Sequence, residues 1–407
     1  MKYKVLIAAQ SLEIGGAERS LVSLLNSLDY SRVEVDLFLC RHMGEFMKYL
    51  PKEVNLLPED PNASMLAKPF KVLLQKYRYR MVYGRLKGKY KTWLYYCFHH
   101  SSKNSCVGLE YSHKYTYSYI APIMPGKIYD YAISFLTPHY IVANKVNAKR
   151  KGAWIHTDYS SIGIDVKSEY RMWEAYDDIF SISESCTEGF LKVFPLLQDR
   201  IVLVENILDT GFVREEAKKR NIRQELMIEG KQICLCTVGR FSEPKNIERI
   251  PEICRQLINR GLNICWILVG YGPKEQLIRD NISRYHVENQ VLIVGKQDNP
   301  YPYIDACDVY VQLSSYEGKS VTVREAQILG KAVVITDYPT AARQLEHGVD
   351  GMILPLELEL FIDELNRFLQ DNTLRLRLQR ECSRRDYGNQ DGVDVLYEMF
   401  GHGKEAR

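Results

Sequence analysis

The chain has 407 residues, of which 46% are hydrophobic and 26% are charged, and its 54 Lys and Arg nearly balance 51 Asp and Glu. This length predicts about two to three domains with ample cores, and the composition excludes collagen-like and wholly disordered chains. The net charge of +3 argues against a dedicated nucleic-acid-binding protein. The longest apolar runs, such as residues 264–270, are too short to span a bilayer.

Cysteine usage and the N-terminal residues bear on the cellular compartment. The ten cysteines are scattered without a C-x-x-C pair, and several lie inside apolar runs. We therefore expect reduced thiols in the core of a cytoplasmic protein. The residues after Met1 lack the apolar core and the small-residue cleavage site of a signal peptide, so we do not expect export.

The first half of the chain alternates short apolar runs with helical patterns. Residues 5–9 predict a buried strand, and a loop with Gly15 and Gly16 leads to a helix from Ala17. Residues 33–40 predict the next strand, so this segment is a βαβ unit with a right-handed crossover. Further buried strands are predicted at 131–135, 151–156, 179–183 and 201–204.

A second α/β series follows a polar, charged segment at 209–230, which suits a helical interdomain linker. Helical patterns such as 250–257 and 323–329 lie between buried runs. Strands that alternate with helices at this spacing predict a doubly wound domain. The buried strands are predicted at 233–238, 264–269, 291–294, 309–313 and 332–335. We therefore predict an α/β protein with two doubly wound Rossmann-like domains facing across a cleft.

Residues 68–103 break this pattern. They hold ten basic residues, nine aromatic residues and no Asp or Glu. One interpretation is a solvated basic helical insertion, and the other is a contact with an anionic membrane or an anionic acceptor. Nucleic acid also attracts basic and aromatic side chains, but no nucleic-acid-binding motif accompanies this segment, and we do not expect nucleic acid as a partner.

Two glutamates, Glu317 and Glu325, flank a predicted junction of strand, loop and helix. The helix would begin near Ser320 and Val321, whose backbone N–H groups could then face an anion. Glu325, one turn into the helix, could accept hydrogen bonds from paired hydroxyls such as those of a ribose. The alternative is that both glutamates simply favour the positive end of the helix.

Charged residues and glycines also follow other predicted strands. Arg240 and Lys245 come just after the strand at 233–238, where ligands bind in doubly wound folds. A guanidinium and an ammonium there can neutralise a diphosphate. Gly270 and Lys296 follow two more strands, and a glycine permits close backbone approach. Each feature alone could be a turn or a surface charge, but together they predict a nucleotide-diphosphate site.

Taken together, these motifs resemble those of the family-4 (group 1) retaining glycosyltransferases of the GT-B architecture. The resemblance covers the C-terminal domain densely and the N-terminal domain at its ends. The most specific match is the pair of glutamates, Glu317 and Glu325, with seven residues between them. The other matching segments are Gly15-Gly16-Ala17-Glu18, Gly239-Arg240-Phe241 with Pro244-Lys245, 269–273, 326–334 and 348–354.

The resemblance implies a role for each matching residue. Glu325 would bind the ribose of the donor, and Glu317 would lie beside the donor sugar. Arg240 and Lys245 would hold the diphosphate, helped by the backbone near Ser320 and Val321. The loop of Gly15 and Gly16 would face the donor phosphates, and His156 is similar to a family histidine near the sugar. The implied catalytic residues are Glu317, His156, Arg240 and Lys245, and the implied donor-binding residues are Gly15, Gly16, Arg240, Lys245, Gly270, Lys296, Glu317, Ser320, Val321 and Glu325.

The resemblance also implies how the chain is organised. Residues 1–208 would form an N-terminal domain on the acceptor side, with the basic aromatic insertion at about 64–125. Residues 209–230 would form the linker, and residues 231–385 the C-terminal nucleotide-sugar-binding domain. Residues 386–407 would form a C-terminal helix that returns to the first domain.

The implied reaction transfers a sugar from a nucleotide diphosphate sugar to an acceptor hydroxyl with retention, in cell-envelope or capsular polysaccharide synthesis. The acceptor would be a glycan or a lipid-linked glycan, and the protein would be cytoplasmic or peripheral on the inner face of the membrane. The chain has no D-x-D triplet, so we expect no cofactor and no metal, with Arg240 and Lys245 supplying the positive charge. Two alternatives stay open: a nucleotide-sugar epimerase of the same architecture and a non-catalytic donor-binding partner subunit.

Overall fold

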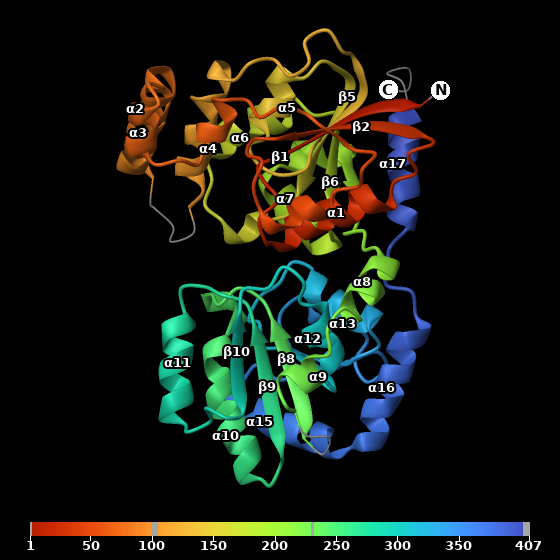
Figure 1. The fold of residues 1–407 in the computed structure, drawn as a ribbon. Helices are drawn as coiled ribbons and strands as arrows, with labels where there is room; N and C mark the ends of the chain where they lie inside the picture. The colour runs from red at the N-terminus through yellow and green to blue at the C-terminus, as the bar shows by residue number, and fades with distance from the viewer. Residues whose placement is uncertain (1, 100–104, 229–231, 402–407) are drawn as a thin grey trace. The chain divides into compact units, whose positions relative to one another are not determined.

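The computed structural model describes residues 2–99, 105–228 and 232–401, and the chain divides into two compact units. Unit 1 comprises Met1–Ile207 together with Gln390–Arg407, and unit 2 comprises Leu208–Asn389. Each unit is an α/β structure built on its own parallel sheet (Figure 1).

Unit 1 contains a seven-stranded parallel sheet in the order β3-β2-β1-β4-β5-β6-β7. Its strands are β1 (Tyr3–Ala9), β2 (Val33–Leu39), β3 (Asn55–Leu56), β4 (Tyr129–Ser134), β5 (Ala148–Ile155), β6 (Asp178–Ser181) and β7 (Ile201–Leu203). Its α-helices are α1 (Gly16–Ser27), α2 (Phe70–Gln75), α3 (Tyr79–Phe98), α4 (Val107–Lys114), α5 (Tyr140–Lys145), α6 (Val166–Trp173), α7 (Glu184–Val193) and α17 (Asp391–Gly401).

Unit 2 contains a six-stranded parallel sheet in the order β10-β9-β8-β11-β12-β13. Its strands are β8 (Ile233–Val238), β9 (Ile264–Val269), β10 (Val291–Gly295), β11 (Val309–Gln312), β12 (Ala332–Thr336) and β13 (Met352–Leu354). Its α-helices are α8 (Thr210–Ala217), α9 (Ile222–Glu225), α10 (Ile250–Asn259), α11 (Glu275–Arg284), α12 (Tyr301–Ala306), α13 (Val321–Ile328), α14 (Ala341–Gln344), α15 (Leu358–Gln370) and α16 (Asn372–Arg384).

Each central strand contains a buried, largely apolar run because both faces of each sheet are covered. In β1, Val5 and Ile7 pack into the core on one face, while Leu6 and Ala8 pack into the core on the other. β8 is divided between two cores in the same way. Continuous apolar runs of this kind are typical of parallel sheets with helices on both sides. The prediction of two doubly wound α/β domains is confirmed.

The strand order gives each sheet a defined place for a ligand. In unit 1 the order reverses between β1 and β4, and in unit 2 it reverses between β8 and β11. Loops at the carboxyl ends of such strands diverge and leave room for a ligand. The segments that follow β8 and β11 carry Arg240, Lys245 and Glu317, so these residues lie at the switch point of unit 2.

The predicted linker at 209–230 is wrong for the part that the structure describes. Residues 208–228 belong to unit 2, where Val213, Ala217 and Ile222 are buried in its core. The prediction relied on the charged side chains of this segment, but its helices α8 and α9 also have an apolar face, which packs against α12 in the core of unit 2. Residues 229–231 lie outside the described part of the chain. At the C-terminal end, α17 packs against β1 and β4 in unit 1.

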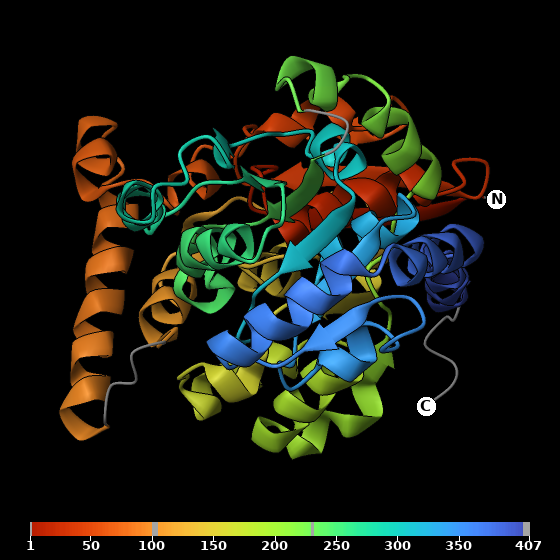
Figure 2. The same cartoon turned by 90° about the horizontal axis from the view of Figure 1, so that it is seen from below.

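The basic aromatic segment folds into α2 and α3, and α3 packs against α4. Figure 2 shows α3 as a long helix at the margin of unit 1. Gly84 and Gly88 lie on the packed side of α3, where a Cβ on Gly84 would come within 2.3 Å of the Tyr115 carbonyl oxygen. Within the described ranges, no helix combines the length and the apolar character needed to cross a bilayer.

Candidate donor site

Two loops of unit 2 meet at its switch point and are tied to each other by hydrogen bonds. The Ser315 backbone N–H donates to the Pro244 carbonyl oxygen at 2.8 Å. The Asn246 side-chain amide donates to the Leu313 carbonyl oxygen at 2.9 Å, and Asn246 itself is left-handed with φ of 50°. Asparagine tolerates this conformation better than most residues do. The loop after β8 is thereby fixed against the loop after β11.

Glu317 is the centre of the polar cluster that these loops hold. Its Oε1 accepts hydrogen bonds from Lys245 Nζ at 2.5 Å, from Gln312 Nε2 at 2.7 Å and from Ser314 Oγ at 2.6 Å. The carboxylate is 13% exposed and the Lys245 side chain is 22% exposed. The structure thus brings together Lys245 and Glu317, which the sequence placed 72 positions apart.

Gln312 and Ser314 belong to this cluster but were missed in the sequence. Both side chains are buried, and both donate to Glu317. A signal was present in the sequence, since Gln312 ends an otherwise apolar strand at the edge where ligands bind. A buried polar residue needs a hydrogen-bond partner, and here the partner is the glutamate of the following loop.

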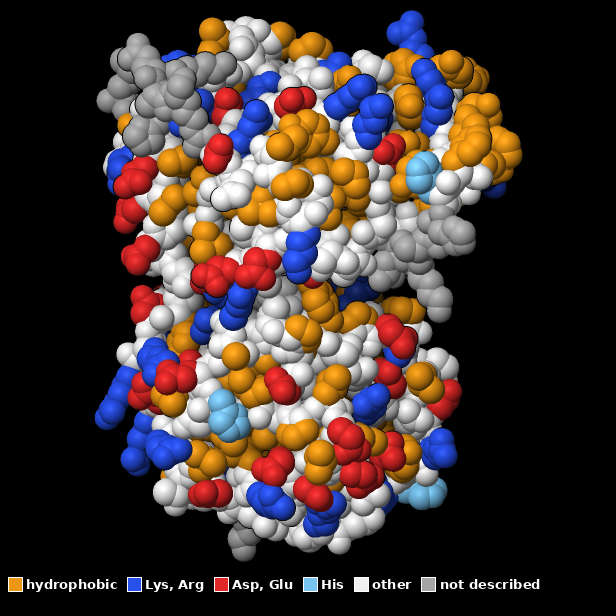
Figure 3. Space-filling model, turned by 180° about the vertical axis from the view of Figure 1, so that it is seen from behind, with side chains coloured by type: hydrophobic (Ala, Val, Ile, Leu, Met, Phe, Trp, Pro, Cys, Tyr) orange, Lys and Arg blue, Asp and Glu red, His pale blue; other side chains and the backbone are white. Residues whose placement is uncertain are grey.

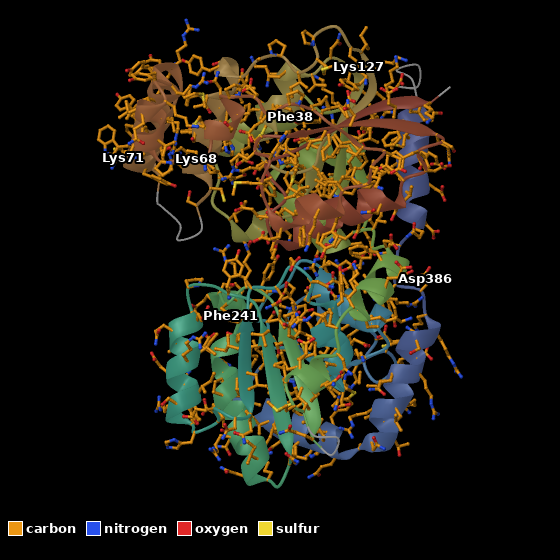
Figure 4. The ribbon with its side chains drawn as sticks, in the orientation of Figure 1. Phe38, Lys68, Lys71, Lys127, Phe241 and Asp386 are labelled. Atoms are coloured by element: carbon orange, nitrogen blue, oxygen red, sulfur yellow. The ribbon has the colours of Figure 1, made fainter. Side chains whose placement is uncertain are left out.

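Arg240 differs from Lys245 in its surroundings. Its side chain is exposed, and no hydrogen bond or ion pair joins it to another side chain in the described ranges. Its neighbour Phe241, labelled in Figure 4, is fully buried and anchors the loop. The site therefore offers one solvated guanidinium and one ammonium that is already neutralised by Glu317.

Gly270 supports the Arg240 loop from the next strand end. A Cβ on Gly270 would come within 1.9 Å of the Gly239 carbonyl oxygen, and its φ of +150° disfavours any other residue. The Gly270 N–H donates to the Gly295 carbonyl oxygen at 2.9 Å. The close approach that this glycine permits is therefore with the protein backbone beside Arg240.

The Ser320 backbone N–H, which the sequence predicts to face an anion, has a protein partner in the structure. This N–H donates to Gln344 Oε1 at 2.7 Å, and the Ser320 hydroxyl donates to Gln312 Oε1 at 3.1 Å. A side chain of α14 therefore occupies the position that the sequence assigned to a phosphate. Val321 is the first residue of α13, so its N–H has no partner within the helix.

Glu325 and Lys296 have protein partners in the structure. Glu325 is fully buried in α13, and its Oε1 accepts a hydrogen bond from the Tyr301 hydroxyl at 3.0 Å. Lys296 follows β10 with its Nζ 5.2 Å from the centre of the Tyr271 ring, a cation–π geometry. A ribose would reach Glu325 by displacing or joining the Tyr301 hydroxyl.

Gly15 and Gly16 lie in unit 1, after β1 and at the start of α1. Gly15 caps the helix in an extended conformation, and the Glu18 carboxylate lies directly against it, within 2.1 Å of where a Cβ would be. Burial raises the pKa of Glu18. No side chain contacts the position of a Cβ on Gly16 among the described residues.

His156 follows β5 in unit 1 and lines a cavity of about 210 Å³. Two further histidines, His113 and His139, line the same cavity. Burial lowers the pKa of His113 to about 4, of His139 to about 3 and of His156 to about 4. The three rings are therefore neutral in the folded protein at pH 7.

These histidines predict a loss of stability on acidification. Unfolded histidines bind protons below about pH 6.5, whereas the buried His139 does not, so the unfolded state gains protons first as the pH falls. Burial raises the pKa of Glu169 in the same cavity to about 7, which acts in the opposite direction between pH 7 and 4.5. The contribution of one histidine is therefore isolated by comparing the wild type with His139→Gln.

We expect wild-type unit 1 to lose about 2 kcal/mol more stability than His139→Gln between pH 6.5 and 4.5. Urea unfolding at several pH values, followed by near-UV circular dichroism, measures the difference. Parallel pH profiles for the two proteins would show that His139 takes up its proton equally well when folded.

Residues 218–385 match the family described as "Glycosyl transferases group 1". An N-acetylgalactosaminyltransferase of Campylobacter jejuni, named for an N-acetylgalactosamine-N,N'-diacetylbacillosaminyl-diphospho-undecaprenol acceptor, is 24% identical over 51% of this chain and 55% of its own length. The amylovoran biosynthesis glycosyltransferase AmsD of Erwinia amylovora is 26% identical over 39% and 45%. The chain thus spans about half the length of these two relatives.

Among solved structures, Anabaena HepE in complex with UDP and glucose is similar over 97% of this chain and 100% of its own, with a TM-score of 0.68 and 17% identity. This likeness concerns the fold, which is GT-B. The matched residues 218–385 contain β8 to β13, Arg240, Lys245, Glu317 and Glu325. Residues 218–385 are therefore similar to the group 1 glycosyl transferases, and the fold of the chain is GT-B.

Proposed function

We propose that the protein transfers a sugar, with retention, from a nucleotide diphosphate sugar to a glycan or lipid-linked glycan in cell-envelope or capsular polysaccharide synthesis. The observation that carries the proposal is the ion pair of Lys245 with Glu317 at the switch point of unit 2, with the exposed Arg240 in the same loop as Lys245. The complex of HepE with UDP supports a nucleotide donor. The diphospho-undecaprenol in the name of the Campylobacter relative supports a lipid-linked acceptor.

The chemistry that this site would supply is stabilisation of a leaving group. When the bond between the sugar and the diphosphate breaks, negative charge grows on the phosphate oxygen. Arg240, which is exposed, can contact this charge directly, and Lys245 can do so while Glu317 holds it in place. Positively charged side chains then serve in place of a metal ion, so turnover should persist in the presence of a chelator.

Product analysis separates this proposal from its alternatives. Incubation with a nucleotide diphosphate sugar and a lipid-linked acceptor should yield a glycoside and a free nucleoside diphosphate. An epimerised sugar nucleotide with no glycoside would identify an epimerase. Donor binding without any product, at every acceptor tried, would favour a non-catalytic partner subunit.

The helix α3 supports a peripheral position on an anionic membrane. Five large side chains recur along it at spacings of four and three residues, and each is more than half exposed. They are Tyr79, Tyr83, Leu86, Tyr90 and Trp93, and we call them the aromatic stripe. At 100° per residue they share one face of the helix. Gly84 and Gly88 lie on the opposite face, Gly88 against α4 and Gly84 against the segment that follows α4.

Cations border the aromatic stripe. Arg80, Lys87 and Lys91 are exposed along one side, and Lys89 is exposed on the other, above the Phe70 ring. Lys68 and Lys71, labelled in Figure 4, lie at the start of the same segment. Figure 3 shows hydrophobic side chains gathered at the upper right, with basic side chains beside them. A helix with an aromatic face and basic borders is typical of the interface of an anionic bilayer.

We expect the full chain to bind vesicles of phosphatidylglycerol and not those of phosphatidylcholine, in a salt-sensitive manner. Each cation near an anionic leaflet contributes about 1 kcal/mol, so reversing two, in Lys87→Glu with Lys91→Glu, should weaken binding by at least about tenfold. Reversal of Lys167 and Lys218, which are exposed outside α3, is the matched control. Co-sedimentation measures the binding.

Two outcomes would contradict this assignment. Equal binding to vesicles of both lipids would show that attraction between the basic side chains and an anionic surface does not drive binding. A dimer that dissociates on Tyr83→Ser and Trp93→Ser would show that the aromatic stripe, whose spacing also suits helix pairing, contacts a second copy instead.

A further inference from the structure

The backbone of the loop from Glu317 to Ser320 is held by side chains of the segment that follows β12. The Thr340 hydroxyl donates to the Glu317 carbonyl oxygen at 2.7 Å. The buried Gln344 side chain bonds the Ser320 backbone twice, because its Oε1 accepts from the N–H at 2.7 Å and its Nε2 donates to the carbonyl oxygen at 3.3 Å. Both ends of the loop are therefore fixed, and the direction of the Glu317 side chain is left to be set by its own contacts.

Gln312, the last residue of β11, joins the Glu317 side chain to the start of α13. Its Nε2 donates to Glu317 Oε1 at 2.7 Å. Its Oε1 accepts from the hydroxyls of Ser320 and Thr322, each at 3.1 Å, and from the Tyr310 hydroxyl at 3.2 Å. The residue is 1% exposed, so both ends of its amide rely on protein partners.

These partners determine which way the amide of Gln312 points. A carboxylate can only accept hydrogen bonds, so the NH2 group of the amide must be the end that faces Glu317. The hydroxyls at the other end can donate to the carbonyl oxygen. Glutamine can make both sets of contacts at once, whereas a methionine of similar size can make neither.

The two carboxylate oxygens of Glu317 have different surroundings. Oε1 accepts from Lys245, Gln312 and Ser314. In the part of the chain that the structure describes, Oε2 has no hydrogen-bond partner and is not among the buried polar atoms that lack one, and the side chain is 13% exposed. One oxygen of Glu317 is therefore held by the protein, and the other is accessible to a ligand.

We propose that Gln312 is a positioning residue, which holds Glu317 through Oε1 so that Oε2 accepts a hydrogen bond from a hydroxyl of the donor sugar. The proposal rests on the proposed function for the identity of that ligand. Lys245 is less suited to this task, because its ammonium ends a flexible stem and is needed for the diphosphate. Gln312 is buried and tied to α13, so it orients the carboxylate before the donor binds.

Calorimetric titration of the full chain with UDP and with UDP-glucose tests this proposal. We expect Gln312→Met to bind UDP-glucose at least about tenfold more weakly, since Glu317 loses a hydrogen bond to a charged group. Its affinity for UDP, which carries no sugar, should be unchanged. In a Glu317→Ala background, Gln312→Met should cause no further loss, because no carboxylate remains to be oriented.

Gln327→Met is the matched control for Gln312→Met. Gln327 is also a fully buried glutamine, and its Nε2 donates to a carboxylate, that of Asp350, at 3.1 Å. It makes no hydrogen bond to Glu317 in the described ranges. Its replacement should lower the stability of unit 2 but leave the affinities for UDP and for UDP-glucose unchanged.

Three results would overturn the role of Gln312. They are unchanged affinity for UDP-glucose in folded Gln312→Met, an equal loss of affinity for UDP, and the same loss of affinity for UDP-glucose in the Glu317→Ala background. A wild-type protein that binds neither nucleotide would instead count against the proposed function.

Crystal structures provide a readout that does not depend on these affinities. In ligand-free Gln312→Met, the Glu317 carboxylate should turn away from Ser314, and a carboxylate in its wild-type position would overturn the proposal. If the variant does not fold, a structure of the wild type with UDP-glucose decides the question. A sugar hydroxyl bonded to Oε1 of Glu317 in place of Gln312 would contradict the proposal, whereas a hydroxyl bonded to Oε2 would support it.

Discussion

Lys245→Ala is expected to lower turnover by about 10²–10³-fold, or ~3 kcal/mol of transition-state stabilisation, while the fold stays intact. Lys245 is partly exposed and makes its ion pair with a residue of a neighbouring loop, so its removal leaves the cores of unit 2 unchanged. The loss should fall on kcat, because the charge that Lys245 opposes grows as the leaving group departs. Steady-state kinetics and circular dichroism together measure the effect.

Arg240→Ala should have a similar effect on turnover, since its guanidinium is the solvated cation of the same site. Lys331→Ala is the matched control for Lys245→Ala. Lys331 is also partly buried, and it forms an ion pair with the carboxylate of Asp305. It precedes β12, however, and so lies at the amino ends of the strands, away from the proposed donor site. Wild-type turnover in both Arg240→Ala and Lys245→Ala would refute the role of these cations.

Gly270→Ala is expected to destabilise unit 2 by about 1–3 kcal/mol and to weaken donor binding as well. The new Cβ would lie 1.9 Å from the Gly239 carbonyl oxygen, so the backbone that carries Arg240 must move. The φ of +150° adds strain for any residue with a side chain. Urea unfolding measures the stability, and calorimetric titration with a nucleoside diphosphate measures the affinity.

Gly295→Ala separates these two causes. Gly295 also has a positive φ, of +75°, but no atom of the described residues lies within 4 Å of where its Cβ would be. The Gly295→Ala variant should therefore be less stable because of backbone strain, but it should bind the nucleotide with unchanged affinity. Equal losses of affinity in both variants would show that the contact with Gly239 does not position Arg240.

Most of the fold could be predicted from the sequence because strands buried on both faces have continuous apolar runs. The strands at 233–238 and 264–269 were predicted with the bounds that the structure gives them. β3 and β13, of two and three residues, were not predicted, although β7, an edge strand as short as β13, was. The segment after residue 208 was mistaken for a linker because its charges hide two helices that pack on unit 2.

Only those residues of the candidate site that directly follow predicted strands could be predicted from the sequence. Arg240 and Lys245 were placed correctly after β8, because the topology alone sets the ligand-binding edge. The hydrogen bond between the Ser320 N–H and Gln344 could not be predicted from the sequence, because the acceptor belongs to a side chain 24 residues away. His113 and His156 come from distant segments too, and only the folded sheet places both in the lining of one cavity.

A crystal structure of the full chain with a nucleoside diphosphate bound tests the central claim most directly. The account predicts the diphosphate outside the carboxyl ends of β8 and β11, with the Arg240 guanidinium and the Lys245 ammonium within hydrogen-bonding distance of its phosphate oxygens. A nucleotide bound at another edge of unit 2, with neither cation in contact with a phosphate, would contradict it.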